Sequence, residues 1–270
     1  MLNIISGDLY RLKKSKSLII SLAVMIVVTL FSYFMIDWAE KVARGEVSEM
    51  VGAVHVTVDE GALTLTDADI IGEVVGSKYF TVIFAIFVCV WITSEFSSGA
   101  IKNTVGKGCS RVKVFLAKYI TAVGIVFFMS VISYIVAVLA GVLLVGTEGV
   151  NAAFCVEVLK YVGVQLILLM AYAGIMVVVS EIARSMVAGI VVSVIIEFFS
   201  MKLFGVIDLI LNIVGIEFKV SRYWIIDNIY ECFVGDISAS LAIRAVIVAV
   251  FWIAVSLGVG MWHFKRTDVK

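Results

Sequence analysis

Ionisable side chains inside long apolar runs are the first candidates for chemistry. Glu197 and Arg244 fall within such runs, and Gln165 is an uncharged polar neighbour. Charges at membrane depth are costly and usually face the interior of a helical bundle or a water-filled path. Glu197 and Arg244 are therefore candidates for a substrate path, a coupling-ion site, or a structural pair between two helices. Arg244 could instead extend its guanidinium toward the outer membrane surface.

The other reactive residue types form no catalytic or metal-binding pattern. His55 and His263 are far apart in the chain, and each is expected to be solvated or interfacial. The four cysteines contain no CxxC pair. A disulfide between Cys155 and Cys232 is possible, but single cysteines acting as small apolar residues are favoured. With no GxSxG, HExxH or paired intramembrane aspartates, the sequence predicts that the chain is not an enzyme.

Nucleotide binding by this chain is also disfavoured. A P-loop requires the spacing G-x-x-x-x-G-K-[ST], so that backbone amides cradle the phosphates and the lysine reaches them. The nearest stretches, GEVVGSK at 72–78 and GAIKNTVGKG at 99–108, have the wrong spacing. No cofactor is therefore expected in this chain, and any ATP that it uses must be bound by a partner subunit.

Composition determines the broad class. The chain has 270 residues, of which 62% are hydrophobic and 16% charged, and its mean hydropathy is +1.13. That is more apolar surface than one soluble core of this size buries, so the sequence predicts an all-α polytopic membrane protein. Because proline is absent, uninterrupted helices are expected. Glycines within the apolar runs, such as Gly141 and Gly260, permit close contact between helices.

The helices can be placed from apolar runs and charge. Residues 1–17 carry apolar side chains at helical spacing and end in a basic cluster, which predicts an amphipathic helix lying at the membrane interface. Six apolar runs long enough to cross a bilayer follow. These predicted spans are 18–36, 79–94, 119–145, 158–179, 186–205 and 241–262.

Charge assigns the connecting segments to the two sides of the membrane. Residues 37–78 hold nine acids and three bases and are expected outside, with a small hairpin across Asp59-Glu60-Gly61. The acids lack EF-hand spacing, so a solvated loop is favoured over a calcium site. Residues 206–240 are expected to be outside or re-entrant. Residues 95–118 hold five bases against one acid and, like both termini, are expected in the cytoplasm.

The cytoplasmic loop 95–118 has its own pattern. Ile101 and Val105 fall four residues apart and would form a small apolar knob, while Lys102 and Lys107 would offer positive charge to an acidic partner. Charge alone also fits an ordinary basic loop that only sets topology. Two further features mark the start of the next span: Ser110 is a candidate N-cap, and Arg111, Lys113 and Lys118 are expected to anchor at the lipid headgroups.

A family resemblance rests on this loop. The succession Glu95-Phe96, Ser97-Ser98-Gly99, Ile101-Lys102-Asn103, a glycine-containing turn, Ser110-Arg111 and Lys118 resembles the ABC-2 type permease family, the membrane subunits of ATP-binding-cassette exporters. The ending Phe264-Lys265-Arg266-Thr267-Asp268 is similar to the family's as well. The likeness in topology covers the whole chain, whereas the specific motif covers about 24 residues. Ala100 departs from the threonine expected there.

The resemblance implies a role for the loop and for partners. It implies a coupling helix that docks on a separate cytoplasmic ATP-binding-cassette ATPase, and a second copy of the permease or a related permease beside it. It also implies export of a peptide, an antimicrobial or another amphipathic or lipid-like substrate across a bacterial-type plasma membrane. The residues assigned to coupling are Glu95, Phe96, Gly99, Ile101, Lys102, Val105 and Arg111.

Two other functions stay open from the residues alone. One is a non-transporting immunity or sensor protein that binds a peptide with its acidic outer loop. The other is an ion-driven secondary transporter that would depend on Glu197.

Overall fold

The structure, a computed structural model, describes residues 1–43 and 66–266. Six helical segments in these ranges are long and apolar enough to cross a membrane, which confirms the predicted all-α class and the six candidate spans. The expected hairpin around Asp59 and the histidine His55 lie outside the described residues. The helices are α1 Leu2–Lys13, α2 Lys16–Ala43, α3 Asp67–Val75, α4 Tyr79–Ser97, α5 Ala100–Gly106, α6 Arg111–Leu144, α7 Ala152–Ala183, α8 Met186–Ile213, the 3-10 helix η1 Ser221–Tyr223, α9 Ile225–Glu231 and α10 Ala239–Arg266.

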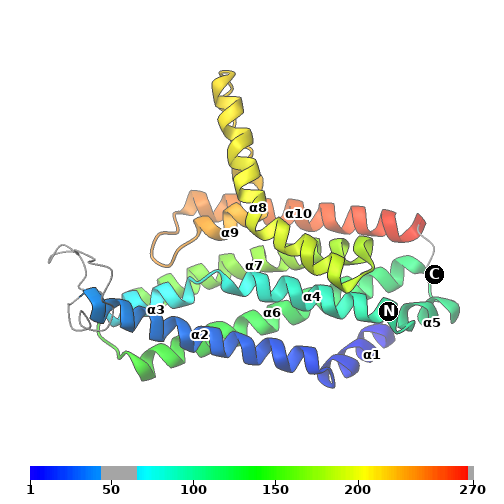
Figure 1. Cartoon of the computed structure of the whole chain (residues 1–270), viewed down its shortest axis with the longest axis horizontal. Coiled ribbons are helices and arrows are strands. Elements are labelled where there is room, and N and C mark those ends of the chain that lie inside the picture. Colours follow the sequence, from blue (N-terminus) through cyan, green and yellow to red (C-terminus); the bar gives the residue numbers. More distant parts are fainter. Residues whose placement is uncertain (44–65, 267–270) are drawn as a thin grey trace.

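The long helices form a bundle around α7. Helices α2, α4, α6, α7 and α10 run side by side, and α7 packs against α4, α6, α8, α9 and α10 (Figure 1). Helices α1 and α5 and the C-terminal end of α10 lie at one end of the bundle, here called the α5 end (Figure 1). Helix α3 lies at the opposite end, here called the α3 end. Within residues 1–43 and 66–266, the segments that the sequence predicts to be cytoplasmic thus gather near the α5 end.

Three glycines let the central helices approach closely. A Cβ on Gly141 of α6 would lie 2.5 Å from the hydroxyl oxygen of Tyr33, and one on Gly174 of α7 would lie 2.7 Å from the ring of Tyr119. A Cβ on Gly260 of α10 would lie 2.6 Å from Cε2 of the Phe115 ring. The expectation that Gly141 and Gly260 permit close helix contact is confirmed, and Gly174 adds a third position.

Helix α3 was not expected, because residues 67–75 were assigned to the outer loop. Thr66 caps the helix: its hydroxyl oxygen accepts a hydrogen bond from the Asp69 amide at 3.3 Å, and the Asp69 carboxylate accepts one from the Thr66 amide at 2.9 Å. Ile71 and Val75 are fully buried, and α3 packs on α6. The acids of this stretch lie on a short helix that is part of the bundle, rather than in a solvated loop.

The long helices extend beyond the predicted apolar runs. Helix α6 begins at Arg111 rather than 119, because the Ser110 hydroxyl oxygen accepts a hydrogen bond from the Lys113 amide at 3.4 Å; the predicted N-cap is confirmed. Helix α7 begins at Ala152 rather than 158, because the Asn151 side chain accepts one from the Phe154 amide at 2.9 Å. Side-chain caps, rather than the edge of the apolar run, determine where these helices start.

Helix α8 also continues past the predicted end at 205, as far as Ile213. Its C-terminal part stands away from the bundle (Figure 1), and the chain then returns. The Asp208 carboxylate closes this return by accepting a hydrogen bond from the Val220 amide at 2.6 Å. The Trp252 indole on α10 donates to the Tyr223 carbonyl at 2.9 Å, and the isoleucines of α9 are buried. Part of the segment 206–240 therefore lies inside the bundle.

The cysteines are all free thiols. Cys155 is exposed near the start of α7, whereas Cys232, which follows α9, is buried. The possible disulfide between them is not formed, and Cys89 and Cys232 pack as small apolar residues in the core.

Candidate functional site

The loop between α4 and α6 forms a short helix between two glycine turns. Gly99 follows the end of α4 with φ of 70°, a backbone conformation that costs other residues steric strain, and α5 starts at the next residue. Gly108, with φ of 83°, reverses the chain again before the cap of α6. Gly108 thus makes the turn into the third span, and Gly99 makes the opposite turn out of α4.

The apolar side of α5 faces the bundle, whereas the sequence predicted that it would face a partner protein. Ile101 is only 2% exposed and packs in the core, and Val105 is partly buried against it. The predicted apolar docking knob is therefore wrong for Ile101, which anchors α5 to the bundle because its side chain points inward. Lys102, Asn103 and Lys107 are exposed and form the outward face.

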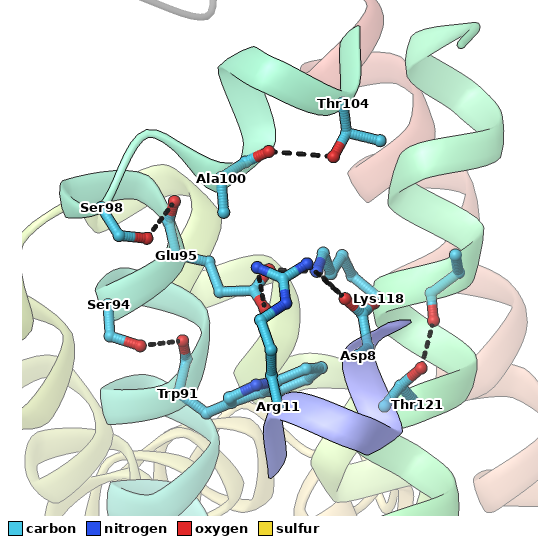
Figure 2. Close-up of polar contacts among 11 residues, drawn as sticks. Asp8, Arg11, Trp91, Ser94, Glu95, Ser98, Ala100, Thr104, Lys118 and Thr121 are labelled. Carbon is cyan, nitrogen blue, oxygen red and sulfur yellow. Dashed lines mark hydrogen bonds and ion pairs between the residues drawn. The ribbon is translucent and has the colours of Figure 1, made fainter. Parts of the chain in front are cut away.

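Glu95 does not face outward either, because it belongs to a buried ionic cluster. Glu95 is 5% exposed, and its carboxylate forms an ion pair with the Lys118 ammonium. The Lys118 Nζ also lies 2.6 Å from the Asp8 carboxylate on α1. Arg11 completes the cluster, 3.1 Å from Asp8 and 3.7 Å from Glu95. Figure 2 shows the four charged side chains pointing toward one another between α1, the end of α4 and α6.

The cluster connects three helices directly below α5. Two carboxylates face two bases, so the group is neutral overall, and the Lys118 ammonium also lies 5.6 Å from the centre of the Trp91 ring. Buried ions lose several kcal/mol of hydration each, so the arrangement is stable only while each charge keeps its partner. The expectation that Lys118 anchors at the lipid headgroups is wrong, since this side chain is 3% exposed.

Two further predicted coupling residues join the α5 end to other helices. The Arg184 guanidinium at the end of α7 lies 5.6 Å from the centre of the Phe96 ring. The Arg111 guanidinium donates a hydrogen bond to the Lys265 carbonyl of α10 at 3.3 Å. Of the seven predicted coupling residues, Glu95, Phe96 and Arg111 thus contact neighbouring helices, while Lys102 faces outward.

Asp8 and Arg11 were missed because α1 was considered only as an amphipathic interfacial helix. A signal was present: Asp8 is the single acid among residues 1–17 and lies three residues before Arg11, so the two share one helical face. An acid on an otherwise basic helix indicates that this face has a charged partner other than the membrane surface.

The second candidate region is the interior of the bundle, where the expected pair of Glu197 and Arg244 is not formed. Arg244 instead binds the carboxylate of Glu231 and lies 3.3 Å from the Asn228 side-chain oxygen, both on α9. Glu197 contacts hydroxyl groups of Thr81, Tyr172 and Tyr230. The two charges were paired from sequence because both lie in apolar runs, but Arg244 lies near the start of α10, where α9 supplies the carboxylate.

Gln165, the uncharged polar residue that was predicted to lie near this pair, also contacts α9. Its amide donates a hydrogen bond to the Ile229 carbonyl at 2.8 Å and so satisfies a buried backbone group. Among the described residues, no three His, Cys, Asp or Glu side chains are grouped closely enough to hold a metal ion. Gln165 and Arg244 thus both contribute polar contacts between a long helix and α9.

Comparison with known proteins adds one match. A family model described as "ABC-2 family transporter protein" matches residues 4–200. The matched region includes most of α1, the ionic cluster, α5 and Glu197. The comparison with curated proteins finds no relative of this chain.

Proposed function

Because the chain belongs to the ABC-2 family of transporter membrane proteins, we propose that it is the permease subunit of an ABC transporter, powered by a separate ATPase that docks on α5. The observation that supports this docking is the division of α5 into two faces. Ile101 holds the helix to the bundle, and Lys102, Asn103 and Lys107 form a polar face on its outer side.

The contacts around α5 suit it to transmit movement. It lies between the end of α4 and the start of α6, and both ends of this connection are bound through the ionic cluster to α1. Phe96 and Arg111 extend the connection to α7 and α10. A displacement of α5 by the ATPase would therefore move several helices together, since packed interiors transmit strain rather than absorb it.

The proposal extends to the assembly and its membrane. The α5 end, with both termini, lies in the cytoplasm of a bacterial-type cell, where the ATPase binds ATP. A second permease, identical or related, completes the transporter. Helices α2 and α8 expose apolar side chains that are available to lipid and to that second subunit. The transported molecule is a peptide, an antimicrobial or another amphipathic or lipid-like substance, which is exported; this step rests on analogy within the family.

Charge reversal on α5 tests the docking. The variant carrying Lys102→Glu and Lys107→Glu changes two exposed charges, and reversal of both costs on the order of 2 kcal/mol of binding, about a thirtyfold loss of affinity. The tagged chain would be purified in mild detergent from its own host, and the amount of P-loop ATPase that co-purifies would be measured. We expect this ATPase with the original chain and a strong reduction with the variant.

The control makes the same charge change at the same end of the bundle but away from α5. Lys13→Glu with Lys14→Glu alters two exposed lysines at the C-terminal end of α1 and should retain the ATPase. If no P-loop ATPase accompanies the original chain, the proposed permease function is wrong. If both variants retain it equally, the function stands, but α5 is not the docking face.

A further inference from the structure

The end of α8 and the chain after it form a hairpin that stands outside the bundle. Residues 203–222, here called the arm, include the last turns of α8, the returning chain and the first residues of η1. In Figure 1 the arm runs across the direction of the other long helices rather than along it. Because those helices cross the membrane, the arm lies along the membrane plane, and its depth is set by the point at which it leaves the bundle.

The arm leaves the bundle at the level of the middle of α10. There the Trp252 indole donates a hydrogen bond to the carbonyl of Tyr223, which directly follows the arm. Trp252 lies eight residues after Arg244 and 13 residues before Lys265, which at 1.5 Å per residue is about 12 Å and about 20 Å along the helix. The apolar stretch between these two bases is about as long as the hydrocarbon core is thick, roughly 30 Å. The foot of the arm is therefore inside the membrane.

The arm has a charged side. An open hollow between its two limbs is lined by two acids and two bases, Asp208, Glu217, Lys219 and Arg222. Asp208 closes the arm by accepting a backbone hydrogen bond, whereas the other three residues are exposed. Within residues 1–43 and 66–266, the backbone amides of residues 217–219 have no hydrogen-bond partner. A polar surface with charges of both signs therefore projects from the bundle at membrane depth.

Lipid is an unfavourable cover for this surface. Irregular backbone within the hydrocarbon core occurs only where protein buries it or where it lines a water-filled cavity, and charged side chains at that depth need the same surroundings. The described part of the chain does not close over the arm, because the arm stands away from the bundle (Figure 1). The covering surface must therefore come from another protein, whether it packs directly on the arm or encloses water with it.

The chemistry of the arm favours an identical arm as that covering surface. Because acids and bases lie together, a two-fold axis between two arms would bring the acids of one toward the bases of the other. Leu203, Val206 and Ile210 of the arm are 53–60% exposed and, at spacings of three and four residues, form one apolar face of α8. This face continues the exposed apolar side of the spanning part of α8, which includes Ile195 and Phe199. Helix packing can therefore extend along α8 from the charged contact.

We propose that the arm is the contact of this chain with a second copy of itself, in which the two arms pack against each other across a two-fold axis. The proposed permease function is the premise, since it requires a second subunit, and the arm identifies that subunit as an identical chain. The contact places each α8 at the centre of the assembly, where the charges of the arm are removed from lipid.

Charge exchange between differently tagged copies tests the contact. Two tagged forms of the full chain are expressed together, solubilised in mild detergent and purified by one tag, and the retained fraction of the other form is measured. Glu217→Lys in both copies gives every arm an excess of positive charge, so retention should fall at least about tenfold. Lys219→Glu in both copies makes every arm acidic and should have the same effect. Glu217→Lys in one copy with Lys219→Glu in the other should restore retention, because opposite charges meet again.

The matched control is Glu148→Lys in both copies, which makes the same charge change at an exposed loop glutamate and should leave retention unchanged. A mixed pair that fails like the uniform pairs, or uniform pairs that are retained like the original, would show that the two arms do not meet, and the proposal would be wrong. If the original copies never co-purify while a P-loop ATPase still does, the permease function stands, but its second subunit is a different chain and the proposed contact is overturned.

Discussion

The free-energy cost of removing a charge depends on how deeply that charge is buried and on which partner its counter-ions keep, and the two bases of the ionic cluster differ in both respects. Lys118 is 3% exposed and faces two carboxylates, whereas the side chain of Arg11 is 47% exposed. Replacement of Lys118 leaves Asp8 and Glu95 close together with only Arg11 beside them. Replacement of Arg11 leaves both carboxylates bound to Lys118.

We therefore expect different effects from two variants that change net charge equally. Lys118→Met should lower the free energy of unfolding by about 3–5 kcal/mol, because it strands buried carboxylates. Arg11→Gln should lower it by no more than about 1 kcal/mol, since water screens the half-exposed guanidinium. Thermal unfolding of the purified protein in detergent measures both. Equal destabilisation by the two variants would contradict the role assigned to burial.

A residue of the candidate sites could be predicted where the sequence immediately around it marks it out. Glu95 was found from the motif of its own loop, and Glu197 from its place in an apolar run. Their partners come from distant segments: Asp8 and Lys118 are 110 residues apart, and Thr81 and Glu197 are 116 apart. Pairing such residues requires the packing of helices, which periodicity and charge do not specify. Arg244 was paired incorrectly for this reason.

Helices of the core approach one another at particular glycines, and α7 allows a comparison within one element. Gly174 has the Tyr119 ring and the Ser256 hydroxyl against it, and those two side chains are hydrogen-bonded at 2.8 Å. Gly163, on the same helix, has no atom of a neighbour within 4 Å of an added Cβ. The first position is restricted by packing and the second is not.

Alanine at the two glycines should therefore act in opposite directions. Gly174→Ala should destabilise the protein by about 1–3 kcal/mol, because α6 and α10 must move away from α7 to make room for the methyl group. Gly163→Ala should be neutral or stabilising by up to about 1 kcal/mol, because alanine favours the helix. Unfolding midpoints of the two variants in the same detergent test this. A loss of stability at Gly163 matching that at Gly174 would indicate a helix effect unrelated to packing.

The number and type of long helices were predictable, but their ends and the short helices were not. The six spans follow from run length and hydropathy, which depend on local sequence. Helix α3 was missed because acids outnumber bases around it, although its apolar residues recur at helical spacing. Helix α9 was left undecided because seven residues are too few to show a period. It is held by a hydrogen bond from Gln165 of α7 to its Ile229 carbonyl, and the preceding η1 by one from Trp252 of α10 to the Tyr223 carbonyl.

At the scale of the whole molecule, the two partly or fully exposed cysteines lie at opposite ends of the bundle. Cys155 is exposed near the start of α7, at the α3 end, and Cys109 is partly exposed between α5 and α6. Because the α5 end is proposed to be cytoplasmic, a membrane-impermeant maleimide added to intact cells should label Cys155 alone. Permeabilised cells should show labelling of Cys109 as well.

Two controls complete this test of orientation. Cys155→Ser should abolish labelling in intact cells, since Cys89 and Cys232 are buried. If Cys109 is labelled in intact cells and Cys155 only after permeabilisation, the chain is inserted in the opposite direction. That outcome would remove the α5 face from the compartment where an ATPase has access to ATP.

The bond between Asp8 and Lys118 also bears on how the protein is made. The two residues are 110 positions apart, and ribosomes add roughly 5–20 residues per second. Asp8 therefore waits for about 5 to 20 seconds before its partner is synthesised. Only when α4 and α6 are in place can α1 settle between them. The first helix to leave the ribosome is thus among the last to be fixed, and until Lys118 is made Asp8 has only Arg11 of its own helix as an ionic partner.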